Sequence, residues 1–167
     1  AIKRGPTGEK LYFNKFFTHC FDESYMSEGG RTLKTIYMAE NPIATKMCLL
    51  SNGEKYEDMQ STSEKYDTYY YHTDHLGSVQ TMTAFDGSLH ERTEYTPYGE
   101  IFSDDRSSQS QFDNAFYFTG KERDEETGLY YYGARYLDGK ASRWLSTDPA
   151  LGDYMSGSER GEGGVYN

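Results

Sequence analysis

Two histidines and an aspartate stand close together in His72-Thr73-Asp74-His75, and these are residue types that ligate zinc or iron. In a strand, His72 and Asp74 would share one face of the sheet and His75 would point to the other. No third partner of a conventional kind is evident in the sequence. The pattern therefore favours a turn stabilised by the Asp74 carboxylate and predicts no metal site.

The other patterns that could carry ligand binding or catalysis are weaker. Asp104, Asp105 and Asp113 lack the glycine and the terminal glutamate of a calcium-binding loop. Neither Cys20 nor Cys48 has the context of a nucleophile or a CxxC arrangement, and the chain has no Gly-x-Ser-x-Gly elbow and no phosphate-binding loop. We therefore expect no cofactor and no activity of this chain on an outside substrate.

Composition restricts the class of partner. The chain has 27 Asp and Glu against 17 Lys and Arg, a formal net charge of -10, which argues against nucleic-acid binding because such binding needs clustered basic residues. No run of apolar residues approaches the ~18 that a membrane span requires. The 167 residues suggest one domain, and 17 tyrosines can build a core in a chain of low mean hydropathy. Because the sequence opens at Ala1, we expect it to be a piece of a longer protein.

Apolar and aromatic residues alternate with a period of two, which predicts antiparallel strands and no sustained helix. The clearest hairpin spans 79–95, with Asp86-Gly87 supplying two positive-φ turn positions. A second hairpin is predicted to join 35–38 to 44–48 through Glu40-Asn41-Pro42. A third is predicted to join 116–118 to 129–132.

Further strands are predicted at 11–17 and 69–71, although three consecutive tyrosines cannot all face one side of a sheet. Asp138-Gly139 predicts a turn before Trp144, and polar composition predicts loops at 54–65 and 103–113. For Cys20 and Cys48, a disulfide and two independent thiols both remain open.

A long ordered series of motifs resembles the RHS repeat-associated core. The series comprises Tyr70-Tyr71-His72-Thr73-Asp74-His75-Leu76-Gly77-Ser78, Asp86-Gly87, Tyr95-Thr96-Pro97-Tyr98-Gly99-Glu100, Phe118-Thr119-Gly120-Lys121-Glu122-Arg123-Asp124, Glu126-Thr127-Gly128-Leu129-Tyr130-Tyr131-Tyr132-Gly133-Ala134-Arg135-Tyr136 and Trp144-Leu145-Ser146-Thr147-Asp148-Pro149. The resemblance covers Tyr69 to Leu151 closely, and Lys34 to Lys46 resembles a preceding YD-type strand pair.

The resemblance implies an all-β fold of antiparallel YD/RHS hairpins that form part of a hollow β-shell. It divides the chain into hairpins leading to the core at 1–66, the core at 67–151 and a flexible or truncated tail at 152–167. RHS and YD-repeat proteins are large bacterial polymorphic toxins, with relatives in insecticidal Tc toxins and animal teneurins. The implied role is to close a shell around a C-terminal toxin domain.

In several family members the core is an aspartyl autoprotease that frees the enclosed domain. The matching positions are Arg123 and Asp124, with Asp138 as a further candidate. One carboxylate would activate water and the other would protonate the leaving group. The family's later Asp-Pro-x-Gly cleavage segment is missing here, so we expect autoproteolysis at most in the full-length parent and none in this fragment.

The resemblance also implies a bacterial protein that is secreted or at the cell surface. Its expected partners are the enclosed toxin domain and neighbouring YD repeats of the same polypeptide, with a secretion-system component or an immunity protein as further candidates. The competing function is a binding module, in which an exposed tyrosine-rich sheet contacts glycans or a partner protein.

Overall fold

The computed structural model describes residues 1–5, 8–22, 30–49, 67–107 and 112–152, and within these it contains two antiparallel sheets. The nine strands of the first sheet pair in chain order: β1 (Ile2–Gly5), β2 (Gly8–Asn14), β3 (Phe17–Asp22), β4 (Arg31–Met38), β5 (Asn41–Leu49), β6 (Thr68–Thr73), β7 (Val79–Ala84), β8 (Leu89–Tyr95) and β9 (Ile101–Arg106). The four strands of the second sheet also follow chain order: β10 (Glu122–Arg123), β11 (Tyr130–Tyr131), β12 (Tyr136–Asp138) and β13 (Arg143–Trp144).

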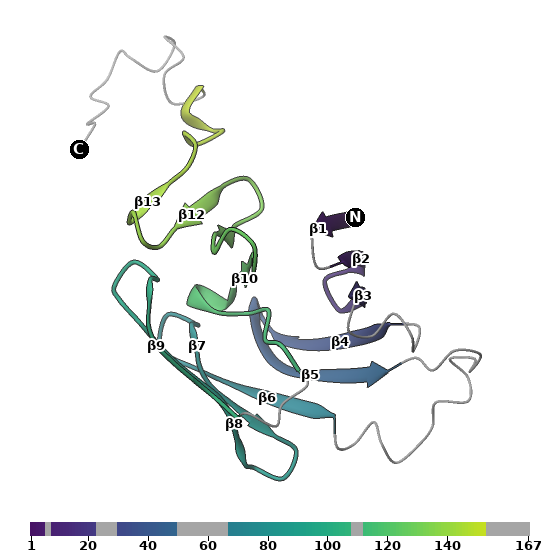
Figure 1. Ribbon diagram of the computed structural model, residues 1–167. Coiled ribbons are helices and arrows are strands. Elements are labelled where there is room, and N and C mark those ends of the chain that lie inside the picture. Colours follow the sequence, from purple (N-terminus) through teal and green to yellow (C-terminus); the bar gives the residue numbers. More distant parts are fainter. Residues whose placement is uncertain (6–7, 23–29, 50–66, 108–111, 153–167) are drawn as a thin grey trace.

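The first sheet curves into an open arc, and the second sheet lies between the two ends of that arc (Figure 1). β1 to β3 stand on one side of the second sheet, and β7 to β9 stand on the other. Sheets of many strands curl because each strand is twisted relative to its neighbour. The fold is thus all-β, as the sequence predicts, and the chain returns into the hollow of its own sheet after β9.

Most of the predicted strands are confirmed. The hairpin of β7 and β8 turns at Asp86-Gly87, and Asp138-Gly139 forms the turn between β12 and β13. The tyrosines of β6 alternate as the pleat requires: Tyr69 and Tyr71 are buried, and Tyr70 is exposed. β5 belongs to the predicted segment 1–66 and β6 to the predicted segment 67–151, and the two strands pair with each other. Both predicted segments therefore contribute strands to one sheet.

Two predicted turns and one predicted strand are wrong in detail. In the Asp86-Gly87 turn only Gly87 has a positive φ, and the hairpin instead accommodates a bulge between Met82 and Thr83. The β4–β5 turn lies before Asn41, so Asn41 and Pro42 belong to β5. The strand predicted over 11–17 is split, because β2 ends at Asn14 and β3 begins at Phe17.

Two further predictions are wrong. The segment 116–118 is no strand partner of 129–132: β10 pairs with β11, and Phe116 folds back to form an isolated bridge with Glu122. The predicted loop at 103–113 begins within β9, whose polar residues are tolerated at a sheet edge. The predicted loop at 54–65 and nearly all of the tail lie outside the described residues.

Buried side chains form two clusters on the inner side of the arc. The first packs on the sheet itself and contains Met47, Tyr69, Tyr71, Val79, Met82 and Phe112. The second lies between the two sheets and contains Tyr117, Phe118, Tyr130 and Leu137. Aromatic rings thus supply much of the apolar area in a chain of low mean hydropathy.

The segment that enters the hollow, 112–121, is held by both clusters and by hydrogen bonds. Phe112 stacks on Tyr69 at 4.4 Å between ring centroids, and its carbonyl accepts a hydrogen bond from His90 Nε2 at 3.1 Å. Val79 N donates to the Tyr117 carbonyl at 3.0 Å. These contacts fix the path of the chain from the first sheet to the second.

We expect the folded state to weaken in mild acid because of two buried histidines. Burial lowers the pKa of His90 below its ordinary value of 6.5, and burial lowers the pKa of His19 in the same way. The unfolded chain therefore binds more protons, so this contribution to stability is present above about pH 6.5 and is lost as the pH falls through the lowered pKa values.

Thermal melts between about pH 7.5 and 5.5 measure this effect. The His90→Gln variant should show a smaller loss of Tm on acidification than the wild type. The comparison isolates His90, since the raised pKa of its neighbour Glu91 acts with the opposite sign in both proteins. Equal pH dependence of the two proteins would contradict the prediction.

The two cysteines are buried and form no disulfide with each other. Cys20 lies in β3 and Cys48 lies in β5, and β4 separates the two strands. Strands that are two positions apart lie roughly 10 Å apart, beyond the ~7 Å between Cα atoms that a disulfide tolerates. Of the two possibilities left open by the sequence, the structure therefore supports independent thiols.

Candidate functional site at the second sheet

The predicted catalytic residues Arg123 and Asp124 lie at the start of the turn that joins β10 to β11. Asp124 N donates to the Leu129 carbonyl at 2.9 Å, and Gly128 N donates to the Asp124 carbonyl at 2.7 Å. These bonds close the polar turn and fix the direction of both side chains. Arg123 is the last residue of β10, and Asp124 follows it at the start of the turn.

The Asp124 carboxylate faces β1. Lys3 Nζ donates to Asp124 Oδ1 at 2.6 Å, and the same ammonium lies 3.6 Å from Glu126 Oε2. Burial of Lys3 acts to lower its pKa, but the hydrogen bond and charge of Asp124 outweigh burial and raise the pKa above 10.5. Asp124 therefore forms a hydrogen-bonded ion pair with Lys3.

The Arg123 guanidinium faces the other way, toward the aromatic cluster between the sheets. It lies 5.9 Å from the centroid of the Tyr117 ring, in cation–π range. Its charge also opposes the effect of burial, which raises the pKa of Tyr130 to about 12. The side chains of Arg123 and Asp124 thus lie on different sides of the second sheet.

Asp138 stabilises its own turn. Its Oδ1 accepts hydrogen bonds from the backbone N–H groups of Lys140 and Ala141, both at 3.0 Å. This is the usual role of an aspartate at the start of a turn. Within the described residues no contact joins Asp138 to Asp124 or Arg123, so the structure does not bring the three predicted residues together.

The possible metal motif forms the predicted turn. Asp74 Oδ1 accepts hydrogen bonds from Leu76 N at 2.9 Å and from Ser78 N at 2.8 Å, and His72 Nε2 lies 3.0 Å from Thr83 Oγ1. The expected role of Asp74 is therefore confirmed. Among the described residues, no three His, Cys, Asp or Glu side chains are grouped so that they could hold a metal ion.

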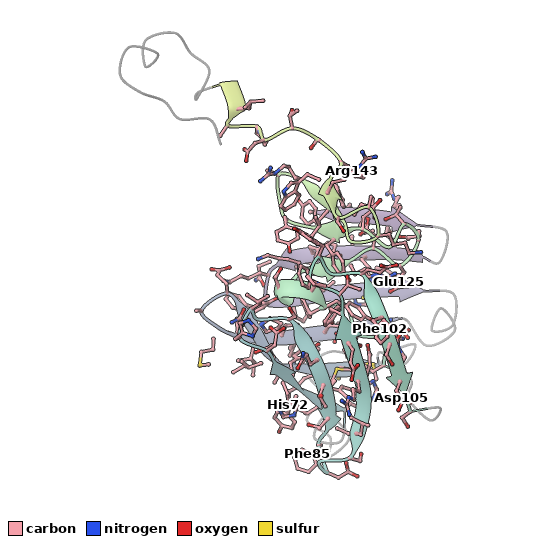
Figure 2. All side chains as sticks on the ribbon, turned by 90° about the vertical axis from the view of Figure 1, so that its left-hand side faces the viewer. His72, Phe85, Phe102, Asp105, Glu125 and Arg143 are labelled. Atoms are coloured by element: carbon pink, nitrogen blue, oxygen red, sulfur yellow. The ribbon has the colours of Figure 1, made fainter. Side chains whose placement is uncertain are left out.

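The sequence alone missed the basic and phenolic groups that meet the acidic turn. Lys10 Nζ lies 3.5 Å from Glu125 Oε1, and Tyr12 OH donates to Glu122 Oε1 at 2.5 Å. Burial, followed by the charge of Glu122, raises the pKa of Tyr12. Figure 2 shows Glu125 beside the purple N-terminal strands. The alternation of side chains in β1 and β2 could have predicted that Lys3, Lys10 and Tyr12 share one face. It could not have predicted that this face meets the acidic turn.

A second ion pair, near the C-terminal end of the second sheet, was also missed. Arg135 Nη2 lies 3.0 Å from Asp148 Oδ2, and the Arg135 guanidinium lies 4.2 Å from the centroid of the Trp144 ring. Asp148 Oδ1 accepts a hydrogen bond from Ala150 N at 3.0 Å. Both residues belong to motifs recognised in the sequence, but neither motif indicates that they pair.

A buried polar network ties β8 and β9 to the entering segment. Glu91 is 2% exposed, and its Oε1 accepts a hydrogen bond from Thr93 Oγ1 at 3.1 Å and lies 3.6 Å from Arg106 Nη2. Arg106 Nη2 also donates to Tyr117 OH at 2.5 Å. Burial raises the pKa of Glu91 against the opposing charge of Arg106. The network fixes Tyr117 between the two sheets.

The comparisons with known proteins point to one family. The sequence model of the Teneurin YD-shell matches residues 57–161, more than half of the chain. Toxin subunit YenC1 of Yersinia entomophaga is 44% identical over 93 residues, which cover 54% of this chain and 9% of that protein. The tRNA nuclease WapA of Bacillus subtilis (strain 168) is 32% identical over 84 residues, which cover 50% of this chain and 4% of that protein.

Solved structures give the same result for the fold. The crystal structure of TcdB2-TccC3-Cdc42 matches with a TM-score of 0.66 at 26% identity, over 86% of this chain and 6% of that chain. The crystal structure of TcdB2-TccC3 matches with a TM-score of 0.62 at 27% identity, over 89% of this chain and 6% of that chain. The chain spans less than a tenth of each of these four proteins. Within the described residues, no helix is long and apolar enough to cross a membrane.

Proposed function

The chain belongs to the Teneurin YD-shell family, and from this premise we propose that it closes the end of a hollow β-shell around a toxin domain that follows it in a longer parent protein. Its role is structural. The parent is secreted or displayed at a bacterial cell surface, and further YD repeats of the same polypeptide extend the shell. A secretion-system component and an immunity protein are further partners to seek.

The observation that carries this proposal is the position of the second sheet. It lies at the open side of the arc, between the two ends of the first sheet (Figure 1). Tyr130 OH donates to the Gly99 carbonyl at 2.6 Å on one side, and Lys3 contacts Asp124 on the other. A sheet that is bonded to both ends of an arc blocks the hollow at that level, as a shell end must.

The similarity to a toxin subunit and to a nuclease supports a toxin domain as the enclosed partner. The proposed division of the chain into leading hairpins (1–66), core (67–151) and tail (152–167) would place the connection to that domain beyond the second sheet. The toxin domain itself is therefore to be sought C-terminal to the core in the parent.

Limited proteolysis of the parent protein tests enclosure. In the wild type, the domain C-terminal to the core should resist a protease that digests the same domain when it is expressed alone. Tyr130→Ala, which removes a contact between the sheets, should expose that domain, whereas Tyr131→Ala should not. Digestion of the wild-type domain at the rate of the isolated domain would reject the proposal and favour the binding module.

Self-cleavage is the second candidate function, and the Arg135–Asp148 pair is the observation that favours it. The pair lies next to Pro149 at the C-terminal end of the described core, the end from which the chain would continue toward a cleavage junction. With Asp124 and Asp138, which lie at separate places, Asp148 gives the parent three carboxylates, any one of which could act on a peptide bond brought close to it. This candidate function is proposed for the parent protein and not for the 167-residue chain itself.

Intact mass and N-terminal analysis of the parent test this candidate. The variants are Asp124→Asn, Asp138→Asn and Asp148→Asn, each compared with the wild type. Loss of a cut in a single variant would identify the carboxylate that is needed, and Arg123→Lys or Arg135→Lys would then identify its cationic partner. If the wild-type parent stays intact, self-cleavage is rejected and the structural role in the shell is the proposal that is kept.

A further inference from the structure

The second sheet contacts the two ends of the arc through chemically different seams. On the side of β8 and β9, the seam is aromatic: the Phe118 ring lies 6.0 Å from the Tyr130 ring and 5.8 Å from the Tyr95 ring, measured between centroids. The Tyr130 side chain is 1% exposed. Burial of apolar area holds such a seam, and salt does not screen it.

On the side of β1 and β2, the seam is charged. Lys3 and Lys10 are paired neighbours in the register of the two strands, so they lie side by side on one face. Two basic groups on one face repel each other unless acidic groups cover them. The acidic turn over residues 122–126 does so, with Asp124 and Glu126 around Lys3 and with Glu122 and Glu125 around Lys10.

These ion pairs are only partly buried. The Lys3 and Asp124 side chains are 31% and 16% exposed, and the Lys10 and Glu125 side chains are 24% and 49% exposed. Partly exposed ion pairs are weak one by one, and ions in solution screen them because the Debye length shrinks to about 3 Å at 1 M salt. This seam therefore depends on ionic strength in a way that the aromatic seam does not.

We propose that the seam between the β1–β2 hairpin and the turn 122–126 is an electrostatic latch. When its charges are screened or reversed, the hairpin separates from the second sheet, and the arc opens on that side alone. The aromatic seam and β6 to β8 stay formed. The inference concerns the fold of this chain and holds whether or not a domain is enclosed.

Hydrogen exchange of the 167-residue chain, followed by mass spectrometry, tests the latch. Raising NaCl from about 50 mM to 1 M should speed amide exchange about tenfold in β1, in β2 and in residues 122–126, since several weak ion pairs are screened together. Exchange in β6 to β8 should stay within about twofold. An equal effect of salt on all strands would overturn the proposal.

Charge reversal provides a second test. Lys3→Glu should speed exchange in the β1–β2 hairpin at low salt, and adding Asp124→Lys to it should restore much of the protection. Arg92→Glu is the matched control, because it changes net charge equally but breaks the exposed Arg92–Glu94 pair in β8. A hairpin that exchanges alike in the Lys3 and Arg92 variants contradicts the latch. If Lys3→Glu does not fold, the salt series on the wild type decides.

Discussion

Gly99→Ala is expected to destabilise the chain by about 2–5 kcal/mol. Gly99 has a φ of +88°, a conformation that costs an L-residue about 1–2 kcal/mol. In addition, a Cβ at this position would lie 2.6 Å from Cδ1 of the Phe118 ring. The ring belongs to the cluster between the sheets, so it has no open space into which it can move.

Gly87→Ala separates the two contributions. Gly87 has a nearly equal φ of +83°, but no atom lies within 4 Å of the position of its Cβ. Chemical denaturation of both variants should show only the backbone cost for Gly87→Ala and the larger loss for Gly99→Ala. At about 2–4 °C of Tm per kcal/mol, the difference is measurable in a thermal melt. Equal losses of stability in the two variants would mean that the Phe118 ring moves aside without cost, which would contradict the prediction.

What the sequence predicted well is local. Alternation of side chains and the Asp86-Gly87 and Asp138-Gly139 turns specify β7, β8 and the end of β12 without information from distant residues. The role of Asp74 as a turn residue was predictable for the same reason, because its bonds reach no further than Ser78. Side-chain alternation and turn motifs each span only a few residues, so they can be recognised directly in the sequence.

What the sequence did not predict depends on residues that are far apart. The Lys3–Asp124 bond joins positions separated by 121 residues, and no pattern within either segment indicates the other. The segment 116–118 has the aromatic composition of a strand, but it enters the hollow of the arc, where contacts with Val79 and Glu122 determine its path. Tertiary contacts override strand preference in such segments.

The predicted catalytic set illustrates the same limit. Arg123 and Asp124 are neighbours in sequence, yet the Arg123 side chain contacts Tyr117 and the Asp124 side chain contacts Lys3. Arg135 and Asp148 are distant in sequence, yet they form an ion pair. That one of these carboxylates cleaves the parent is a prediction, and the three aspartate variants test it.

Tyr130→Ala is expected to cost about 3–5 kcal/mol, the usual range for truncating a large buried aromatic side chain. Tyr130 is 1% exposed and packs with Phe118 in the cluster between the sheets. Its truncation also removes the hydrogen bond to the Gly99 carbonyl, so the aromatic seam loses both apolar contact and a buried polar link. Denaturant unfolding, followed by the fluorescence of Trp144, measures the loss.

The three consecutive tyrosines 130–132 provide a control at the next position. Tyr131 is 45% exposed, so Tyr131→Ala should cost much less, although the two substitutions are identical in chemistry. Tyr130→Phe keeps the ring and removes only the hydroxyl, which should cost about 1–2 kcal/mol because the Gly99 carbonyl loses its partner. If Tyr130→Ala and Tyr131→Ala prove equally destabilising, the second sheet does not pack into the arc through Tyr130, and the shell-closing role loses its main structural support.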